Sequence, residues 1–395
     1  MRLEQRDSYL RRFASRVLEV ENGADGVWVT LRESAFYPTS GGQLHDTGRL
    51  GDQPVLDVAL KDGRVWHRLE GASLRPEQEV EGVLDWERRY RHMQRHSAQH
   101  LLSQAFVRVS RAYATHSVSL RGPDCTVDIA GDPGDDELAS AEHLANTFAY
   151  ADLPVTSFEV DEQELDDYAL RRPPKVHGRI RLVAMGDIEI AACGGTHVAA
   201  TAETLPIKLL GSERVRGGLR RVTFRTGWEA LEDYGAKHQL AADLVQRFSA
   251  PLDALGGRIV RLQEELAETR AAQAEALRRR ADEVAERLLR DGRVRRGARV
   301  VSAEVDDALL DAVAAVLGER EGVAALLTAR SEGRARLAFV AGPGSGVDVR
   351  PALRAALSEI DGKGGGRPDR AQGAGTRTEA LDSALQAAWR ALPDD

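Results

Sequence analysis

The sequence predicts an α+β protein with an N-terminal β-barrel, an α+β middle domain with a metal site, a long helical or coiled-coil linker and a C-terminal α/β domain. Short runs rich in valine and leucine alternate with glycine turns up to about residue 90. Helical and strand-like segments mix from there to residue 228, and a long helical pattern follows. We therefore place domain limits at residues 1–90, 91–228, 229–297 and 298–395.

Composition restricts the class of protein. The 54 basic residues are outnumbered by 62 acidic ones, so a nucleic-acid partner must be bound by local patches rather than by the whole surface. Two cysteines exclude a disulfide framework. No apolar run is long enough for a membrane span, and the first residues lack the apolar core of a signal peptide. These features predict a cytoplasmic protein with reduced thiols and no membrane partner.

The pattern changes from strand-like to helical at about Asp85, which can cap a helix extending to about Val109. Before it, strands are expected at residues 16–20, 27–31, 55–60, 65–69 and 79–84. After it, strands are expected at residues 115–120, 125–129, 155–160, 180–184, 188–193, 207–211 and 219–226, and a helix at 135–151. The middle domain should therefore pack helices on an antiparallel sheet.

The linker is helical up to about residue 290. Pro251 interrupts it, and Ser249 could cap a new helix there. Apolar side chains then follow coiled-coil spacing at Leu255, Ile259, Leu262, Leu266, Ala274, Leu277, Ala281, Val284 and Leu288. A helix over residues 251–290 would be about 60 Å long, too long to bury within a small domain. It should separate two domains or pair with a second copy, which predicts a homodimer formed through the linker and the C-terminal domain.

The last domain alternates strand-like and helix-like segments. Strands are expected at residues 300–305, 323–329 and 335–341, and helices at 306–317, 348–359 and 377–391. The glycine-rich run 362–375 is interpreted as a loop. Its cationic side chains, Lys363, Arg367 and Arg370, suit contact with an RNA backbone, although a loop that only caps the domain would fit equally.

Four side chains suggest a metal site. His96 and His100 are four residues apart on the predicted helix, so both rings leave one face, and Cys193 and His197 show the same spacing. Three imidazoles and a thiolate form a donor set that suits Zn²⁺. The alternative is that the histidine pair is incidental and the cysteine is a small buried apolar residue. The presence of both pairs favours zinc.

Three further segments are candidate binding sites. In residues 36–48, Gly41 and Gly42 allow a ligand to approach the backbone and Gln43 can donate and accept hydrogen bonds, although a plain glycine turn explains the same letters. Residues 170–183 and 213–225 concentrate positive charge that could meet phosphates, or could simply be solvated. The candidate tRNA-contacting residues there are Arg171, Arg172, Lys175, Arg220 and Arg221.

Taken together, these motifs resemble the editing domain of alanyl-tRNA synthetase and its free-standing relatives, the AlaX proteins. The matching segments are FYPTSGGQLHDTG at 36–48, RHSAQHLL at 95–102, ACGGTHV at 192–198 and GGLRRVTFRTG at 217–227, in the family's order. The glycine-rich run resembles the C-terminal domain of the synthetase. The long form of AlaX is the best match. Because no aminoacylation core precedes the barrel, we expect an editor that acts in trans.

The resemblance implies hydrolysis of the ester in tRNA(Ala) mischarged with serine, with the glycine-mischarged form as a second candidate. It also implies that His96, His100, Cys193 and His197 surround zinc, and that the segment holding Gly41, Gly42 and Gln43 borders the aminoacyl-adenosine site. Where the synthetase usually has a glutamine, this sequence has Ser119 if THSVS at 115–119 is counted straight, or Leu120 if the following Arg121-Gly122 step is aligned with a one-residue insertion. That departure leaves open an alternative: a catalytically inactive, zinc-containing tRNA-binding or dimerisation module.

Serine differs from alanine by one added hydroxyl, so a size filter cannot admit serine and exclude alanine. A pocket that hydrogen-bonds the hydroxyl can discriminate, because alanine would leave its polar groups unpaired. Candidates for this contact are Thr39, Gln43, Thr115 and Ser119. Zinc could activate water or only position the substrate. Four protein ligands would fill a tetrahedral shell and favour positioning, with attack by a water that is not a ligand.

Overall fold

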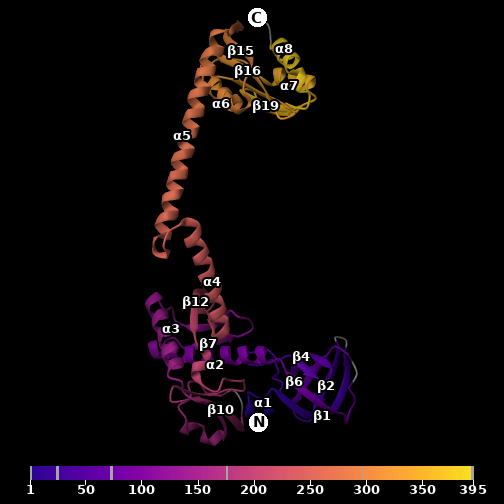
Figure 1. The fold of residues 1–395 in the computed structure, drawn as a ribbon, viewed down its shortest axis with the longest axis vertical. Coiled ribbons are helices and arrows are strands. Elements are labelled where there is room, and N and C mark those ends of the chain that lie inside the picture. The colour runs from indigo at the N-terminus through magenta and orange to yellow at the C-terminus, as the bar shows by residue number, and fades with distance from the viewer. Residues whose placement is uncertain (1, 24–25, 72–73, 175–176, 296, 393–395) are drawn as a thin grey trace. The chain divides into compact units, whose positions relative to one another are not determined.

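The computed structural model describes residues 2–23, 26–71, 74–174, 177–295 and 297–392. Backbone contacts divide the chain into two compact units, Met1–Asp243 and Leu244–Asp395, and each is described by itself. Figure 1 labels the elements. Within the described ranges, no helix is both long and apolar enough to cross a membrane.

Six antiparallel strands close a barrel at the N-terminus, which confirms the predicted barrel (Figure 1). A short helix, α1 (Leu3–Arg6), precedes β1 (Arg12–Gly23), β2 (Gly26–Leu31), β3 (Gly48–Leu50), β4 (Gln53–Lys61), β5 (Arg64–Leu69) and β6 (Glu79–Leu84). The strand order is β1-β2-β5-β4-β3-β6, and β6 pairs back with β1. Strand β3 was not predicted, because three residues are too few to show an alternating pattern.

The rest of the first unit is mixed α+β. Helix α2 (Trp86–Val109) begins where predicted, with the Asp85 carboxylate accepting a hydrogen bond from the Arg88 backbone N–H. One sheet has the order β12-β13-β8-β7, and a second has the order β11-β10-β9. The elements are β7 (Thr115–Ser119), β8 (Cys125–Ala130), α3 (Asp135–Tyr150), β9 (Val155–Asp161), η1 (Glu162–Asp167), β10 (Arg179–Met185), β11 (Glu189–Ala192), η2 (Thr201–Thr204), β12 (Ile207–Val215) and β13 (Leu219–Thr226).

Helix α2 is the central element of this unit, because it is buried along most of its length. Leu101, Leu102 and Phe106 pack into the core that α3 and the four-stranded sheet share. The N-terminal half of α2 is fastened to the barrel by Arg89. Its guanidinium pairs with the Asp46 carboxylate and donates to the carbonyl oxygens of Ser8 and Ala35. This ion pair therefore fixes the barrel and α2 relative to each other. The turns of α2 that carry the histidines come directly after Arg89 along the helix.

Two long helices follow β13. They are α4 (Gly227–Phe248) and, after the short turn η3 (Leu252–Ala254), α5 (Leu255–Arg290). The expected cap at Ser249 is wrong. Ser249 has a left-handed φ of 46°, and Pro251 caps the intervening turn instead. The 36 residues of α5 make a helix of about 54 Å, close to the predicted length.

The predicted apolar seam of α5 has two different environments. Near its C-terminal end, Ala281 and Ala285 are buried in the core of the C-terminal domain. Earlier along the helix, Ile259, Leu266 and Leu277 are 37%, 51% and 40% exposed. A second copy was expected to cover the whole seam, but its C-terminal end is covered by the C-terminal domain of the same chain. Coiled-coil pairing of the remainder stays a prediction.

The C-terminal domain is α/β, as predicted. Its sheet has the order β14-β15-β16-β17-β19-β18, in which only the β15–β16 pair is parallel. Helices α5 and α6 pack against one apolar cluster, and α7 and α8 against another. The elements are β14 (Arg293–Arg295), β15 (Ala298–Glu304), α6 (Asp307–Gly318), β16 (Val323–Ser331), β17 (Arg334–Ala341), α7 (Arg350–Glu359), β18 (Lys363–Arg367), β19 (Arg370–Gly375), η4 (Thr378–Ala380) and α8 (Leu381–Ala391).

The glycine-rich run is a β-hairpin, so its interpretation as a loop is wrong. Strands β18 and β19 pair antiparallel from Lys363–Ala374 to Arg367–Arg370. A Cβ at Gly364 would lie 2.4 Å from the Gln372 carbonyl oxygen, and one at Gly366 would lie 2.3 Å from that of Arg370. The glycines therefore permit a close approach of two backbones. The composition suggested a loop because glycine is depleted in ordinary strands.

Candidate metal centre and adjoining cavity

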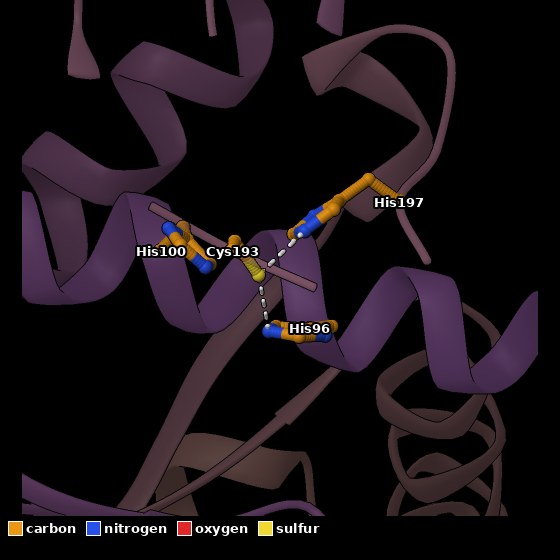
Figure 2. A group of neighbouring side chains, drawn as sticks. All are labelled: His96, His100, Cys193 and His197. Atoms are coloured by element: carbon orange, nitrogen blue, oxygen red, sulfur yellow. Dashed lines mark hydrogen bonds between the residues drawn. The ribbon is translucent and has the colours of Figure 1, made fainter. Parts of the chain in front are cut away.

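The four predicted metal ligands meet at one point. One ligand atom from each of His96, His100, Cys193 and His197 lies within 4.8 Å of the others. Figure 2 shows the histidine pair on α2, with Cys193 and His197 facing it from the segment after β11. The imidazoles are only 5%, 6% and 4% exposed. Spacing in the sequence predicted each pair, and the fold brings the two pairs together.

The distances suit a tetrahedral ion. The Sγ atom of Cys193 lies 3.4 Å from Nε2 of His96 and 3.3 Å from Nε2 of His197 (Figure 2). Two ligands bonded to one zinc ion at its usual distances would lie about 3.3–3.8 Å apart. Three nitrogens and one sulfur are also the donor types that zinc prefers. The donor set therefore fits zinc in number and chemistry, and the two distances from the Cys193 sulfur fit its spacing.

Each imidazole is held from behind by a polar neighbour. Nδ1 of His96 lies 2.8 Å from Oε1 of Gln43, and Nδ1 of His100 lies 3.0 Å from Oε2 of Glu189. Both oxygens can only accept, so these two Nδ1 atoms carry a proton and Nε2 is the candidate ligand atom of each ring. Burial would lower the pKa of His100, but Glu189 and then Cys193 raise it to about 10, so a metal would displace a proton from its Nε2. Nδ1 of His197 contacts the Ser97 hydroxyl at 3.0 Å. Sequence spacing gave no sign of Glu189 or Ser97 in this role.

Two features shape the segment that carries Cys193. A Cβ at Gly195 would lie 2.1 Å from Cε1 of His96, so only glycine lets the chain pass over that ring. The guanidinium of Arg181 on β10 donates to the carbonyl oxygens of Cys193, at 2.8 Å, and of Gly195, at 2.9 Å. Gly195 thus leaves room for the imidazole of His96, and Arg181 holds the turn of ACGGTHV against the sheet by hydrogen bonds.

The electrostatics favour a thiolate. Burial alone would raise the pKa of the Cys193 thiol, but His96 and His197 outweigh it and lower this pKa well below the usual range. Burial keeps the pKa of His197 at about 3, so this ring is neutral at physiological pH. Burial would likewise raise the pKa of Glu189, but His100 and then Arg171 lower it, so its carboxylate stays ionised. A thiolate and imidazole lone pairs are the forms that bind a metal.

A cavity of about 740 Å³ opens beside the cluster. His100, Cys193 and Gly194 contribute to its wall, and Gly41 reaches it from the segment after the barrel strand β2. Basic side chains form much of the remaining wall, namely Arg171, Arg172, Arg179 and Arg181. The cavity therefore combines a candidate metal centre with a cationic surface, a combination that suits an anionic substrate.

The predicted substrate-contacting residues occupy different environments. Gly41 lines the cavity, whereas Thr39, Gly42, Gln43, Thr115 and Ser119 do not belong to its wall. Gln43 is fully buried behind His96, and its amide nitrogen donates to the Thr196 hydroxyl. Thr115 is buried and donates to Ser103, while the Thr39 hydroxyl accepts from the His45 N–H. Ser40, which the sequence analysis did not single out, lines the wall next to Gly41.

The predicted tRNA-contacting residues fall into three groups. Arg171 pairs with buried Glu189, while exposed Arg172 lines the cavity. On β13, Arg220 pairs with Asp132 and Arg221 with Asp128. Lys175 lies outside the described residues. The exposed cations of the C-terminal hairpin are Lys363, Arg367 and Arg370. Their contact with tRNA stays a prediction.

We expect Glu189→Gln to weaken metal binding about 10–100-fold, because an uncharged amide holds the His100 ring less firmly than a carboxylate does. Competition with a chromophoric chelator at fixed pH measures this affinity. The matched control is Glu159→Gln on β9, which lines the same cavity and whose ion-pair partner is Arg179. Equal metal affinities for wild type and Glu189→Gln would show that Glu189 does not support the centre.

Comparisons with known proteins agree with this architecture. The threonyl and alanyl tRNA synthetase second additional domain matches residues 180–223, and the DHHA1 domain matches residues 297–394. The alanyl-tRNA editing protein AlaX-L of Pyrococcus horikoshii is 30% identical over 397 residues, covering 94% of each chain.

Larger relatives match as well. The alanine–tRNA ligase of Pyrobaculum neutrophilum is 34% identical over 390 residues, and that of Archaeoglobus fulgidus is 31% identical over 404 residues. These alignments cover 93% and 98% of this chain but only 42% and 43% of the ligases, so the chain spans less than half of those relatives. The chain therefore belongs to the AlaX-L family of alanyl-tRNA editing proteins, which is related to the editing and C-terminal domains of alanyl-tRNA synthetase.

Proposed function

We propose that this chain is a trans-editing deacylase that hydrolyses the ester of tRNA(Ala) mischarged with serine. One observation carries the proposal: His96, His100, Cys193 and His197 converge beside a cationic cavity, and His100 and Cys193 form part of its wall. An aminoacylated tRNA terminus brings phosphates and an ester to the same place. A cavity that combines basic walls with a metal centre suits both.

We propose zinc as the cofactor, held by Nε2 of the three histidines and Sγ of Cys193. When bound, zinc would supply a fixed positive charge that polarises and anchors the polar 3′ end of the substrate. Four protein ligands fill a tetrahedral shell, so we propose that the attacking water is not among the ligands. Gln43, Glu189 and Ser97 would keep the rings oriented during turnover.

The chain's own side chains would position the substrate. Arg172 is exposed at the cavity wall and suits a phosphate near the 3′ end. Arg171 is already neutralised by Glu189, so its part would be to hold that carboxylate. Ser40 presents a hydroxyl at the wall beside Gly41, and we propose it as the contact for the serine hydroxyl. Discrimination against alanine then follows from a hydrogen bond that alanine cannot make.

A second contact with the tRNA would come from the C-terminal hairpin. Lys363, Arg367 and Arg370 are exposed there, on strands whose glycines leave the backbone open to an approaching ligand. On β13, Arg220 and Arg221 would contribute less, because Asp132 and Asp128 already offset their charge. We also propose pairing of two copies along the exposed apolar side chains of α5.

Time courses of hydrolysis with seryl-, glycyl- and alanyl-tRNA(Ala) test the activity. We expect the seryl ester to be cleaved faster than the alanyl ester by a factor on the order of 10⁴, typical of sites that hydrogen-bond a substrate hydroxyl. The glycyl ester should be slower than the seryl ester, because it lacks that hydroxyl. Ser40→Ala should reduce the ratio of the seryl-ester to the alanyl-ester hydrolysis rate. Absence of seryl ester hydrolysis by a metal-loaded chain would refute the proposal and favour a binding module.

A further inference from the structure

A second cationic cavity lies one turn earlier along α2, and none of the residues considered above for tRNA contact belongs to it. Its volume is about 350 Å³. Arg88, Arg91, His92 and Arg95 line it from the helix, and Arg121 lines it from the turn after β7. Its wall also contains the carboxylates of Asp85 and Glu87. Four guanidinium groups thus face two carboxylates, which favours an anion over a metal.

The arginines differ in how far they are already neutralised. Arg95 pairs with buried Glu229, and Arg91 pairs with Glu87 and Glu232. Among the described residues, the Arg88 guanidinium has one hydrogen-bond partner, the His45 carbonyl oxygen, to which its Nε donates. Exposed Arg121 has no partner among the residues that the structure describes. The terminal nitrogens of Arg88 and the whole Arg121 guanidinium are therefore available to a ligand.

His92 adds an uncharged hydrogen-bond donor to the arginines of this cavity. It is 3% exposed, and its Nδ1 is buried without a hydrogen-bond partner in the described structure. Burial first, and then the charges of Arg95 and Arg88, hold the pKa of His92 at about 3. Nδ1 is unpaired in either tautomer of the neutral ring, so Nε2 is the ring nitrogen left to contact a ligand. Since His92 lines the cavity, Nε2–H can donate to an anion there.

The closeness of this cavity to the metal-centre cavity indicates which anion it binds. His92 and His96 are one helical turn apart, about 6 Å along α2. The segment from Gly41 to His45 links the two cavities, since Gly41 lines the larger one and the His45 carbonyl accepts a hydrogen bond from Arg88, which lines the smaller one. We propose that this cavity binds a backbone phosphate of the RNA whose 3′ end enters the metal-centre cavity. This proposal rests on the proposed function for its ligand.

Salt-dependent binding of uncharged tRNA(Ala) to the full chain tests it. Arg121→Gln should weaken binding about tenfold, the size of a charge-assisted contact, and lower the slope of log K against log salt by about one. Arg121→Lys should recover part of the loss. The control is Arg64→Gln, which removes an exposed cation that pairs with Glu19 on the barrel and should change neither quantity.

Three other outcomes would decide against the site, and a fourth would decide against the proposed activity. Unchanged affinity and slope in Arg121→Gln would overturn it, and so would equal losses in Arg121→Gln and Arg64→Gln, because the effect would then be one of net charge. Titration with inorganic phosphate separates the two sources of the anion: saturable binding that needs Arg121, with unchanged tRNA affinity, would indicate a free-phosphate site and overturn the RNA proposal. If Arg121 governs tRNA affinity but no mischarged tRNA is hydrolysed, the site stands and the proposed activity fails.

Discussion

Replacing Cys193 with alanine should abolish bound zinc and seryl-tRNA(Ala) hydrolysis together. The thiolate lies within 3.4 Å of two imidazole nitrogens and is the single sulfur among the four candidate ligands. Loss of a supporting partner behind a ligand typically weakens metal binding about 10–100-fold, so loss of the ligand itself should cost at least about 100-fold. Metal content of the purified variant and its single-turnover hydrolysis rate measure the two losses.

The second cysteine provides a matched control. Cys125 is buried in the core on β8, and its Sγ contacts the Gly122 carbonyl oxygen rather than an imidazole. Cys125→Ala should keep full zinc content and hydrolysis, with some loss of stability from the smaller side chain. If Cys193→Ala kept both zinc and activity, the four-ligand centre would be wrong. If it kept zinc but lost activity, Cys193 would serve the reaction without holding the metal.

Replacing Asp46 with alanine should destabilise the first unit strongly. Asp46 and Arg89 are both fully buried, and the pair joins the barrel to α2. Removing one partner of a buried ion pair leaves an uncompensated charge, which usually costs about 3–5 kcal/mol. The backbone N–H of Tyr37 would also lose its acceptor, the Asp46 carboxylate. Urea unfolding followed by circular dichroism measures the change in the free energy of unfolding.

An exposed ion pair in the same barrel serves as the comparison. Arg12 and Glu81 lie 3.5 Å apart with side chains 70% and 57% exposed, so Glu81→Ala should change stability little. The double variant Asp46→Ala/Arg89→Met should be more stable than Asp46→Ala alone, because no charge is left buried. Equal stability of wild type and Asp46→Ala would mean that this pair does not join the barrel to the helix.

Much of the fold could be predicted from local patterns. Alternation along 79–84 reflects a face buried in the core, and Asp85 marks the start of α2 as its N-cap, so the sequence records both directly. The strand β3 and the glycine hairpin could not be found this way. β3 is too short to alternate, and β18 consists mainly of glycines that have no side chain to form a pattern.

In the site, too, local patterns predict some features and miss others. His96 with His100, and Cys193 with His197, are local pairs that spacing can detect. Their convergence, and the polar groups behind the rings, depend on contacts between distant parts of the chain. Gln43 is 53 residues from His96, and Glu189 is 89 residues from His100. Glu189 lies within the apolar segment IEIAA, and no role was predicted for it. Gln43 was predicted to touch substrate, and its position behind His96 emerges only when the barrel and α2 pack together.

X-ray absorption at the zinc edge of the purified full-length chain is the most direct test of the proposed metal centre. We predict one zinc per chain with three nitrogen neighbours at about 2.0–2.1 Å and one sulfur neighbour at about 2.3 Å. The sulfur contribution should disappear in any zinc left in the Cys193→Ala variant. A zinc shell of oxygens alone, or a sulfur signal that persists without Cys193, would contradict the centre formed by His96, His100, Cys193 and His197.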